Sequence, residues 1–303
     1  MSYVTSIKDL IGHTPLLQIT HFDLPEGVNL FAKLELWNPL GSVKDRPGYY
    51  MVKDAETRGK LRAGSTIIEA TAGSTGTGIA LAALNKGYRI IFVVPTKFSE
   101  EKQQLMRALG AEIINTPREE GMLGAVRKAE KLLKEIPQSI SLKQFDNLAN
   151  PQSHYETTGP EIWDDLSGQI NYVVAGAGSG GTYSGVLKYL KEKNPSIQGV
   201  LADPLGSTMG GGYHADYNIE GIVNDFIPKT MDMNLVDHVI KISDDEAFKA
   251  VHDLARKEGV IAGSSSGAAL SASLNLIQEG IKGNIVTIFP DRGDRYFSKG
   301  LWS

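Results

Sequence analysis

The chain of 303 residues contains no cysteine. Without a thiol it has no disulfide, thiolate zinc site, iron–sulfur ligation or cysteine nucleophile, a composition compatible with a reducing cytosol. Any covalent chemistry must therefore use another residue type.

An excess of one charge sign is also lacking, because 31 Lys and Arg stand against 35 Asp and Glu, a net charge of −4. So weak a charge provides no electrostatic footprint for nucleic acid or for an anionic membrane surface.

Long hydrophobic runs are missing as well. No stretch approaches the ~18 uncharged residues of a membrane span, and residues 1–10 carry Lys8 and Asp9 where a signal segment would be apolar. We therefore expect an untargeted, cytoplasmic protein. Glycine is plentiful, with 33 residues, in a chain whose apolar fraction of 41% and charged fraction of 22% are typical of a globular enzyme.

From about residue 65, short β-branched runs alternate with longer segments of helical period, which is typical of parallel βαβ units. Two such series lie on either side of a polar join at residues 146–152, so we predict an α/β fold. The expected strands are residues 66–70, 89–94, 111–114, 171–175, 199–203, 260–262 and 284–289. The expected helices are residues 78–85, 100–110, 119–135, 182–193, 244–258 and 266–279.

The strongest local motif is the glycine-rich loop Gly176–Thr182, between an expected strand and an expected helix. Glycines at a helix start expose backbone N–H groups to an anion, which predicts a phosphate site. The same loop fits GxGxxG, and Asp203 ends a strand about twenty residues later, where a ribose-binding acid would stand. A nicotinamide-dependent oxidoreductase is therefore one alternative, and a tight turn without a ligand is another.

Two further segments place polar groups at expected helix starts. Thr71–Gly76 offers three hydroxyl groups that suit a carboxylate, although Ser and Thr are also common helix caps. Gly41–Arg46 places Lys44 where the helix dipole disfavours a cation, which lowers the pKa of the lysine and favours imine chemistry. A phosphate site, a carboxylate site and an activated lysine together suit pyridoxal phosphate chemistry. The six histidines form no metal-binding pattern, so no metal site is expected.

Five motifs stand in the order found in a known enzyme family. They are Gly41–Arg46, Thr71–Gly76, Gln144–Phe145, Gly178–Thr182 and Gly263–Gly267. Together they resemble the cysteine synthase and cystathionine β-synthase family of fold-type II pyridoxal phosphate enzymes. The likeness starts at Ile11–Leu16 and covers nearly the whole chain. Residues 120–125 and 294–299 look closest to bacterial O-acetylserine-dependent cystathionine β-synthases.

The resemblance implies two three-layer αβα domains with mostly parallel sheets, as in the β subunit of tryptophan synthase. Residues 39–147 would form a smaller, mobile domain with the substrate-carboxylate loop, and residues 1–38 plus 148–303 a larger domain with the phosphate loop. A homodimer is implied too. Because the chain ends soon after Gly300 and its amino terminus is short, we expect neither the paired regulatory repeats nor the haem extension of some cystathionine β-synthases.

The same resemblance implies roles for single residues. Lys44 would hold pyridoxal 5'-phosphate as a Schiff base and act as the base at the substrate Cα. The other expected cofactor-binding residues are Ser74, Gly178, Ser179, Gly180, Gly181, Thr182 and Ser265, the last facing the pyridine nitrogen. The expected residues for the substrate carboxylate are Thr71, Ala72, Gly73, Thr75 and Gln144. A neutral hydroxyl facing the ring nitrogen would leave it largely unprotonated, which suits β-elimination.

The implied reaction is β-replacement on O-acetylserine or serine through an aminoacrylate intermediate, where homocysteine would give cystathionine and sulfide would give cysteine. The partners would be these small substrates, with no nucleic acid and no membrane. Departures from the family pattern leave the substrate pair open, since Ser74 replaces asparagine and Val223 replaces glycine. A cysteine desulfhydrase or a synthase with an amine nucleophile is the alternative within the family. A catalytically weak, regulatory member of the family is a further alternative, beside these enzymes and the nicotinamide-dependent oxidoreductase.

Overall fold

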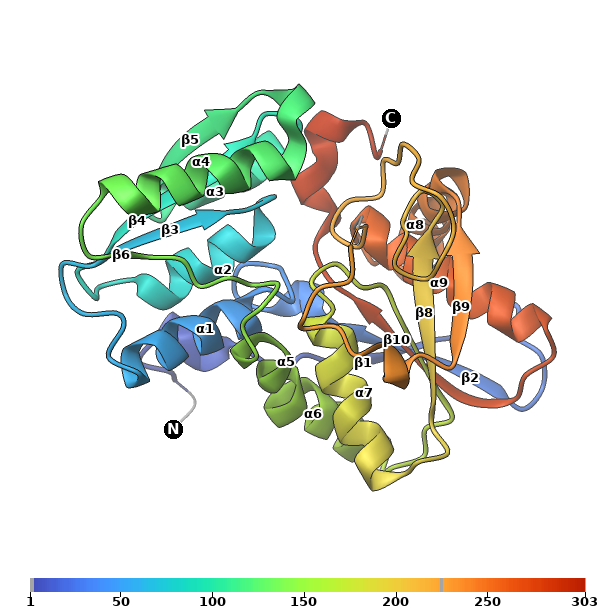
Figure 1. The fold of residues 1–303 in the computed structure, drawn as a ribbon. Helices are drawn as coiled ribbons and strands as arrows, with labels where there is room; N and C mark the ends of the chain where they lie inside the picture. The colour runs from blue at the N-terminus through green and yellow to red at the C-terminus, as the bar shows by residue number, and fades with distance from the viewer. Residues whose placement is uncertain (1–2, 224–225, 303) are drawn as a thin grey trace.

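The computed structural model describes residues 3–223 and 226–302 and contains two β-sheets, each between layers of helices (Figure 1). The predicted α/β fold of two three-layer units with mostly parallel strands is confirmed. Most strands expected from apolar runs are buried on both faces, as parallel sheets covered by helices require.

The smaller sheet has four parallel strands in the order β5–β4–β3–β6. Helices α1 and α2 pack on one face and α4 packs on the other (Figure 1). The elements of this unit are α1 (Asp45–Thr57), β3 (Thr66–Ala70), α2 (Ser74–Ala83), β4 (Arg89–Pro95), α3 (Glu100–Ala108), β5 (Glu112–Thr116), α4 (Gly121–Glu135) and β6 (Ser139–Ile140).

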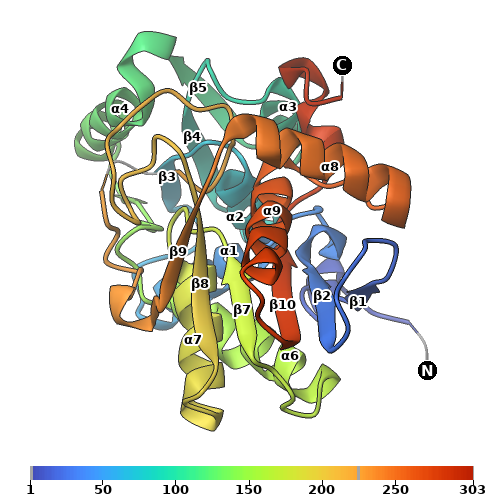
Figure 2. The same ribbon diagram turned by 90° about the vertical axis from the view of Figure 1, so that its right-hand side faces the viewer.

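The larger sheet has the order β1–β2–β10–β7–β8–β9, and β1 alone runs antiparallel to its neighbour. Helices α8 and α9 cover one face and α6 and α7 the other (Figure 2). Its strands are β1 (Leu16–Ile19), β2 (Val28–Leu34), β7 (Tyr172–Ala175), β8 (Gln198–Pro204), β9 (His238–Ile242) and β10 (Gly283–Phe289). Its helices are α5 (Ala149–Ser153), α6 (Gly159–Asp165), α7 (Gly181–Lys193), α8 (Asp244–Glu258) and α9 (Ser264–Gln278).

Alternation along the strands assigns residues to the two cores of the larger sheet. In β8, Val200 and Ala202 belong to the core beneath α8 and α9, whereas Leu201 belongs to the core beneath α7. Successive side chains of a strand point to opposite faces, so an unbroken apolar run serves both cores at once.

Two local predictions are wrong. Residues 260–262 form only an isolated bridge between Ala262 and Arg292, because the chain turns into α9 two residues later. The helix expected at residues 78–85 starts earlier, at Ser74. Its glycines serve helix packing, since a Cβ on Gly78 would lie 2.1 Å from the carbonyl oxygen of Lys44. Periodicity also misses β1, β2, β6, β9, α5 and α6, most of which are short.

The strand ends place the loops that matter for function. In parallel sheets the carboxyl ends of the strands meet at one edge, where ligands usually bind. The chain leaves β3 into residues 71–73, β7 into residues 176–180, and β10 into Pro290 and Asp291. Among the described residues, no helix has both the length and the apolar character that a bilayer crossing needs.

Candidate active site

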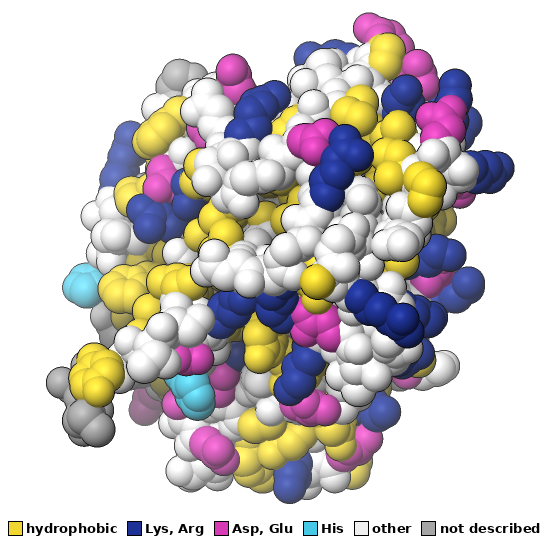
Figure 3. All heavy atoms as spheres, turned by 90° about the vertical axis from the view of Figure 1, so that its left-hand side faces the viewer, with side chains coloured by type: hydrophobic (Ala, Val, Ile, Leu, Met, Phe, Trp, Pro, Cys, Tyr) yellow, Lys and Arg dark blue, Asp and Glu magenta, His cyan; other side chains and the backbone are white. Residues whose placement is uncertain are grey.

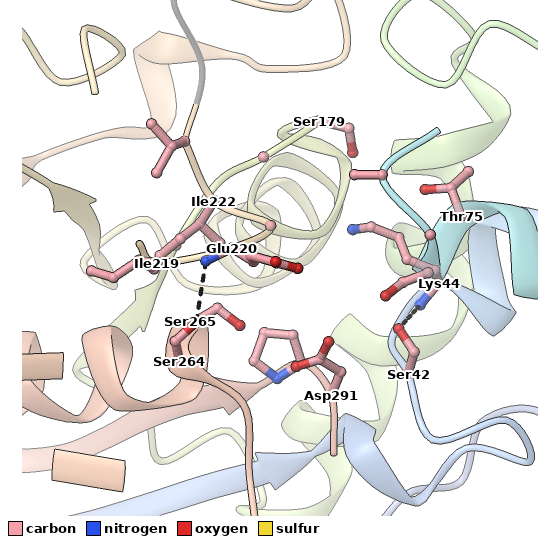
Figure 4. Close-up of a pocket in the computed structure, with 18 of the residues that line it drawn as sticks. Ser42, Lys44, Thr75, Ser179, Ile219, Glu220, Ile222, Ser264, Ser265 and Asp291 are labelled. Atoms are coloured by element: carbon pink, nitrogen blue, oxygen red, sulfur yellow. Dashed lines mark hydrogen bonds between the residues drawn. The ribbon is translucent and has the colours of Figure 1, made fainter. Parts of the chain in front are cut away.

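A cavity of about 310 Å³ lies where these loops meet. Of the predicted site residues, all except Gly181 line it; the lining includes Lys44, Thr71, Ala72, Gly73, Ser74, Thr75, Gln144, Gly178, Ser179, Gly180, Thr182 and Ser265. Figure 4 shows Lys44 and Thr75 on one side and Ser265 and Glu220 on the opposite side. Segments more than 200 residues apart in the sequence, such as those of Lys44 and Ser265, thus share one cavity.

Lys44 lies at the N-terminus of α1, and its side chain extends into the cavity (Figure 4). Burial lowers the pKa of the Lys44 ammonium to about 8. The nearby Asp291 carboxylate opposes this shift, and the Lys102 ammonium adds to it. A lowered pKa matches the expectation from the sequence, but burial is its main cause rather than the helix dipole. The uncharged amine that imine chemistry needs is therefore accessible near neutral pH.

The glycine positions of the loop before α7 have no room for side chains. A Cβ on Gly178 would lie 2.1 Å from the carbonyl oxygen of Gly221, and Gly180 has a φ of 79°. Gly181 begins α7 and packs on Asn150, which explains why it does not line the cavity. Because Gly180 offers no side chain to cap α7, the first N–H groups of this helix face a cradle that suits an anion.

Thr182, in the first turn of α7, contacts a buried histidine that sequence patterns do not single out. Its Oγ1 lies 3.2 Å from His154 Nε2, and His154 Nδ1 lies 2.9 Å from Thr158 Oγ1. Burial, with the charges of Arg46 and Lys44, holds the pKa of His154 well below its ordinary value. A neutral imidazole has one donor and one acceptor nitrogen, so it can fix the orientation of both hydroxyls.

The expected carboxylate loop has a backbone conformation that favours glycine. Gly73 has a φ of 132°, and its N–H donates to Thr71 Oγ1 over 3.0 Å. The loop is joined to Gln144, because Thr75 Oγ1 donates to Gln144 Oε1 over 2.6 Å. Ser74 opens α2, and its carbonyl oxygen accepts a hydrogen bond of 2.7 Å from Thr77 Oγ1.

A buried cluster around Lys102 also lines the cavity and is missed by the sequence motifs. Lys102 Nζ lies 2.9 Å from the Tyr296 hydroxyl, 3.4 Å from Glu220 and 3.5 Å from Asp291. It also lies 4.2 Å from the centre of the Tyr296 ring. These contacts join α3 of the smaller unit to Glu220 and Tyr296, which lie 118 and 194 residues away in the chain. Local sequence patterns cannot predict contacts over such separations.

Asp203 does not stand where a dinucleotide would need it. Its buried carboxylate accepts hydrogen bonds from the Gly210 N–H and from the Lys241 ammonium, and it does not line the cavity. An acid held by these two groups is not presented to a ribose. The described residues also contain no group of His, Asp and Glu side chains that could hold a metal ion.

Comparison with known proteins agrees with the geometry. Residues 7–291 match the family described as pyridoxal-phosphate dependent enzyme. The chain is 50% identical to an O-acetylserine dependent cystathionine beta-synthase of Bacillus subtilis over 303 residues, covering 100% of this chain and 99% of the relative. It is 46% identical to a cysteine synthase of Helicobacter pylori strain J99, covering 99% of both chains.

A solved structure of an O-acetylserine dependent cystathionine beta-synthase from Helicobacter pylori superposes with a TM-score of 0.96 at 45% identity. The match covers 100% of both chains. The sequence motifs, the cavity that unites them and these comparisons agree, and the chain belongs to the pyridoxal-phosphate dependent enzyme family.

Proposed function

We propose that the chain catalyses β-replacement on O-acetylserine or serine, with homocysteine giving cystathionine or sulfide giving cysteine. The observation that carries the proposal is the shared cavity, where a lysine of lowered pKa lies with a glycine-rich helix start and the Thr75–Gln144 pair. The names of the two sequence relatives support the same class of reaction. Family membership overturns the alternative of a nicotinamide-dependent oxidoreductase.

The residues present fit pyridoxal phosphate. The cradle at Gly178–Thr182 combines glycines that leave backbone N–H groups accessible with the hydroxyls of Ser179 and Thr182, which suits a phosphate group, and Lys44 supplies the amine that binds its aldehyde carbon. Ser265 lies in the first turn of α9, where we place the pyridine nitrogen. When bound, pyridoxal phosphate withdraws electrons from the Cα of an attached amino acid.

Residues of the chain then supply orientation and proton transfer. The loop Thr71–Thr75 and the amide of Gln144 bind the substrate carboxylate, which fixes the Cα relative to Lys44. The uncharged Lys44 amine accepts the Cα proton while acetate or hydroxide leaves Cβ. After the sulfur of the thiol has added at Cβ, Lys44 returns its proton to Cα, and the thiol proton passes to the released acetate or hydroxide. Because the pKa of Lys44 is about 8, the amine can both accept and return this proton near neutral pH.

The substrate pair depends on residues that depart from the family pattern. Ser74 and Val223 both line the cavity, so both lie where a substrate is bound. A cysteine desulfhydrase or a synthase with an amine nucleophile uses the same residues for binding and proton transfer. The nucleophile therefore has to be decided by assay.

We extend the proposal to the assembly. Tyr3, Val4, Ile7 and Leu10 are between 45% and 69% exposed, which supports a homodimer that covers them. Figure 3 shows the side of the molecule where the chain begins, with hydrophobic side chains among charges of both signs. This mixture favours small-molecule substrates over a polyanion partner. We extend the proposal to a cytoplasmic location. We keep residues 39–147 as the smaller domain, since they contain every strand of the smaller sheet.

The test is the release of acetate from O-acetylserine by the holoenzyme, with homocysteine and sulfide assayed in parallel. We expect acetate together with cystathionine or cysteine, identified by mass spectrometry. The Lys44→Ala variant, loaded with the cofactor under the same conditions, serves as the control and should release none. Absence of cystathionine and cysteine from both O-acetylserine and serine contradicts the proposal, and release of sulfide and pyruvate from L-cysteine as the main activity identifies the desulfhydrase.

A further inference from the structure

Glu69 is a buried acid next to the active site to which the reaction assigns no role. It lies on β3, two residues before Thr71, and only 4% of its surface is exposed. Burial raises the pKa of the Glu69 carboxyl group, so a charge at this position needs donors. The side chain does not line the cavity, which means that it acts on the site through other residues.

The Glu69 carboxylate is hydrogen-bonded to one short segment, residues 141–144. Oε2 accepts from the Ser141 hydroxyl over 2.7 Å, from the Leu142 N–H over 2.9 Å and from the Lys143 N–H over 3.3 Å. Oε1 accepts from the Gln144 N–H over 3.4 Å. One carboxylate therefore binds three successive backbone N–H groups, an arrangement that orients a segment strongly.

The segment has reason to need such support. Lys143 has a φ of 55°, in the left-handed region that residues with a Cβ seldom adopt. β6, which precedes the segment, is only two residues long, so little regular structure holds the chain at this point. Glu69 sits on the neighbouring strand, paired with β6, and is placed to hold the turn.

Gln144 connects segment 141–144 to the active site. Its side chain accepts the Thr75 hydrogen bond, and its carbonyl oxygen accepts a hydrogen bond of 2.8 Å from Asn150 Nδ2. Asn150 Nδ2 also donates to Ser179 Oγ, in the glycine-rich loop, over 2.9 Å. A shift of segment 141–144 would therefore move the Gln144 amide away from Thr75, whereas the glycine-rich loop keeps the hydrogen bond that Thr230 Oγ1 donates to the Ser179 carbonyl oxygen.

We propose that Glu69 is a positioning residue, whose carboxylate holds segment 141–144 so that the Gln144 amide meets Thr75 and the pair faces the substrate carboxylate. The inference rests on the proposed function in one respect, namely that the ligand is an α-amino acid. It assigns Glu69 to the binding of the carboxylate group and not to the binding of the cofactor.

The test compares Glu69→Met and Glu69→Gln with wild type as holoenzymes. Binding of L-alanine, which has no leaving group, is followed by the shift in cofactor absorbance. We expect Glu69→Met to raise the Kd for L-alanine by about 10- to 100-fold. Glu69→Gln keeps an acceptor oxygen for the three shorter hydrogen bonds and should stay within about fivefold of wild type. Ethylamine lacks a carboxylate, so its Kd should be the same in all three proteins.

Hydrogen exchange provides a readout that needs no ligand. The amides of residues 142–144 should exchange faster in Glu69→Met than in wild type, and Glu69→Gln should restore most of their protection. Ile68→Val is the matched control, because Ile68 is buried on the opposite face of β3 against α4. This variant should lower stability slightly and leave both the Kd for L-alanine and the exchange of residues 142–144 unchanged.

An unchanged Kd for L-alanine in Glu69→Met overturns the inference, and so does an equal loss of affinity for ethylamine. If Glu69→Met does not fold, Ser141→Ala removes the shortest of the four hydrogen bonds and should raise the Kd for L-alanine but not for ethylamine. Failure of the proposed function looks different. In that case wild type releases no acetate from O-acetylserine, while the effect of Glu69 on L-alanine binding remains.

Discussion

Thr75 Oγ1 donates a hydrogen bond of 2.6 Å to Gln144 Oε1, and both side chains are buried although 69 positions separate them in the chain. The contact joins the loop after β3 to the segment after β6, two strands that pair in the smaller sheet. A buried acceptor that loses its donor costs more than the hydrogen bond itself is worth. The pair is therefore a sensitive place to test substrate binding.

Thr75→Val keeps the shape of the side chain but removes the donor. We expect the KM for O-acetylserine to rise about tenfold, because the Gln144 amide loses the partner that orients it. Steady-state kinetics at a saturating concentration of nucleophile measures the effect. Thr57→Val is the control, since the Thr57 hydroxyl is exposed and donates to the Lys53 carbonyl oxygen of its own helix. Equal KM values for Thr75→Val and wild type would refute the role of the pair.

Ser74→Asn should raise the rate of β-replacement. The resemblance implies that asparagine at this position contacts the cofactor oxygen, and Ser74 is too short to make the same contact. One added hydrogen bond corresponds to a gain of about 2- to 10-fold in kcat/KM. Initial rates with O-acetylserine and homocysteine measure it. A rate that is unchanged or lower counts against this interpretation of Ser74.

The pKa of Lys44, about 8, predicts how the cofactor-free protein takes up pyridoxal phosphate. Only the uncharged amine reacts with the aldehyde, so the rate should rise about tenfold per pH unit below pH 8 and level off above it. Absorbance after rapid mixing between pH 6.5 and about 9.5 measures this dependence. A rate that does not change across this range would show that Lys44 is already uncharged.

The same shift predicts how the stability of the cofactor-free protein depends on pH. Between about pH 8 and the ordinary lysine value of 10.5, the unfolded chain binds more protons at Lys44 than the folded chain does. Lys44 should therefore make the free energy of unfolding rise with pH in this window. Urea unfolding of wild type and Lys44→Met measures the difference, and parallel pH profiles for the two proteins would contradict the assignment.

Lys102→Met should lower stability. The Lys102 side chain is only 6% exposed and contacts Glu220, Asp291 and the Tyr296 hydroxyl, so the substitution leaves polar groups without a buried partner. The Glu220 carboxylate still has a cationic partner in the variant, because Lys299 Nζ lies 3.6 Å from Glu220 Oε1. This contact limits the loss of stability. We expect the free energy of unfolding to fall by about 2–3 kcal/mol.

Urea unfolding of the holoenzyme measures this change. Lys249→Met is the matched control, because Lys249 is 78% exposed and pairs with Asp253 on the surface of α8. Its effect should stay below about 0.5 kcal/mol. A similar, small effect for the two variants would show that the cluster around Lys102 does not hold the two units together.

The sequence alone determines much of this protein, because some of its signals are local. Near-continuous β-branched runs and helical periods predict the parallel strands, and the ordered motifs around Lys44, Thr71–Gly76 and Gly178–Thr182 predict the site. Each motif carries its own chemistry, such as a glycine that admits an anion or a lysine at a helix start. Their meeting in one cavity follows once parallel strands place their carboxyl ends at a common edge.

Other features are decided only by the tertiary structure. Local propensity predicts a loop at the glycines of α2. They nevertheless lie in a helix, because α1 packs closely against Gly78. Lys102, Asn150 and Glu69 belong to no motif, and their partners lie on segments far away in the chain. Periodicity reports which face of an element is buried, but not which polar group of another element will be there. That depends on how the elements dock, so the residues that support the site became visible only in the folded chain.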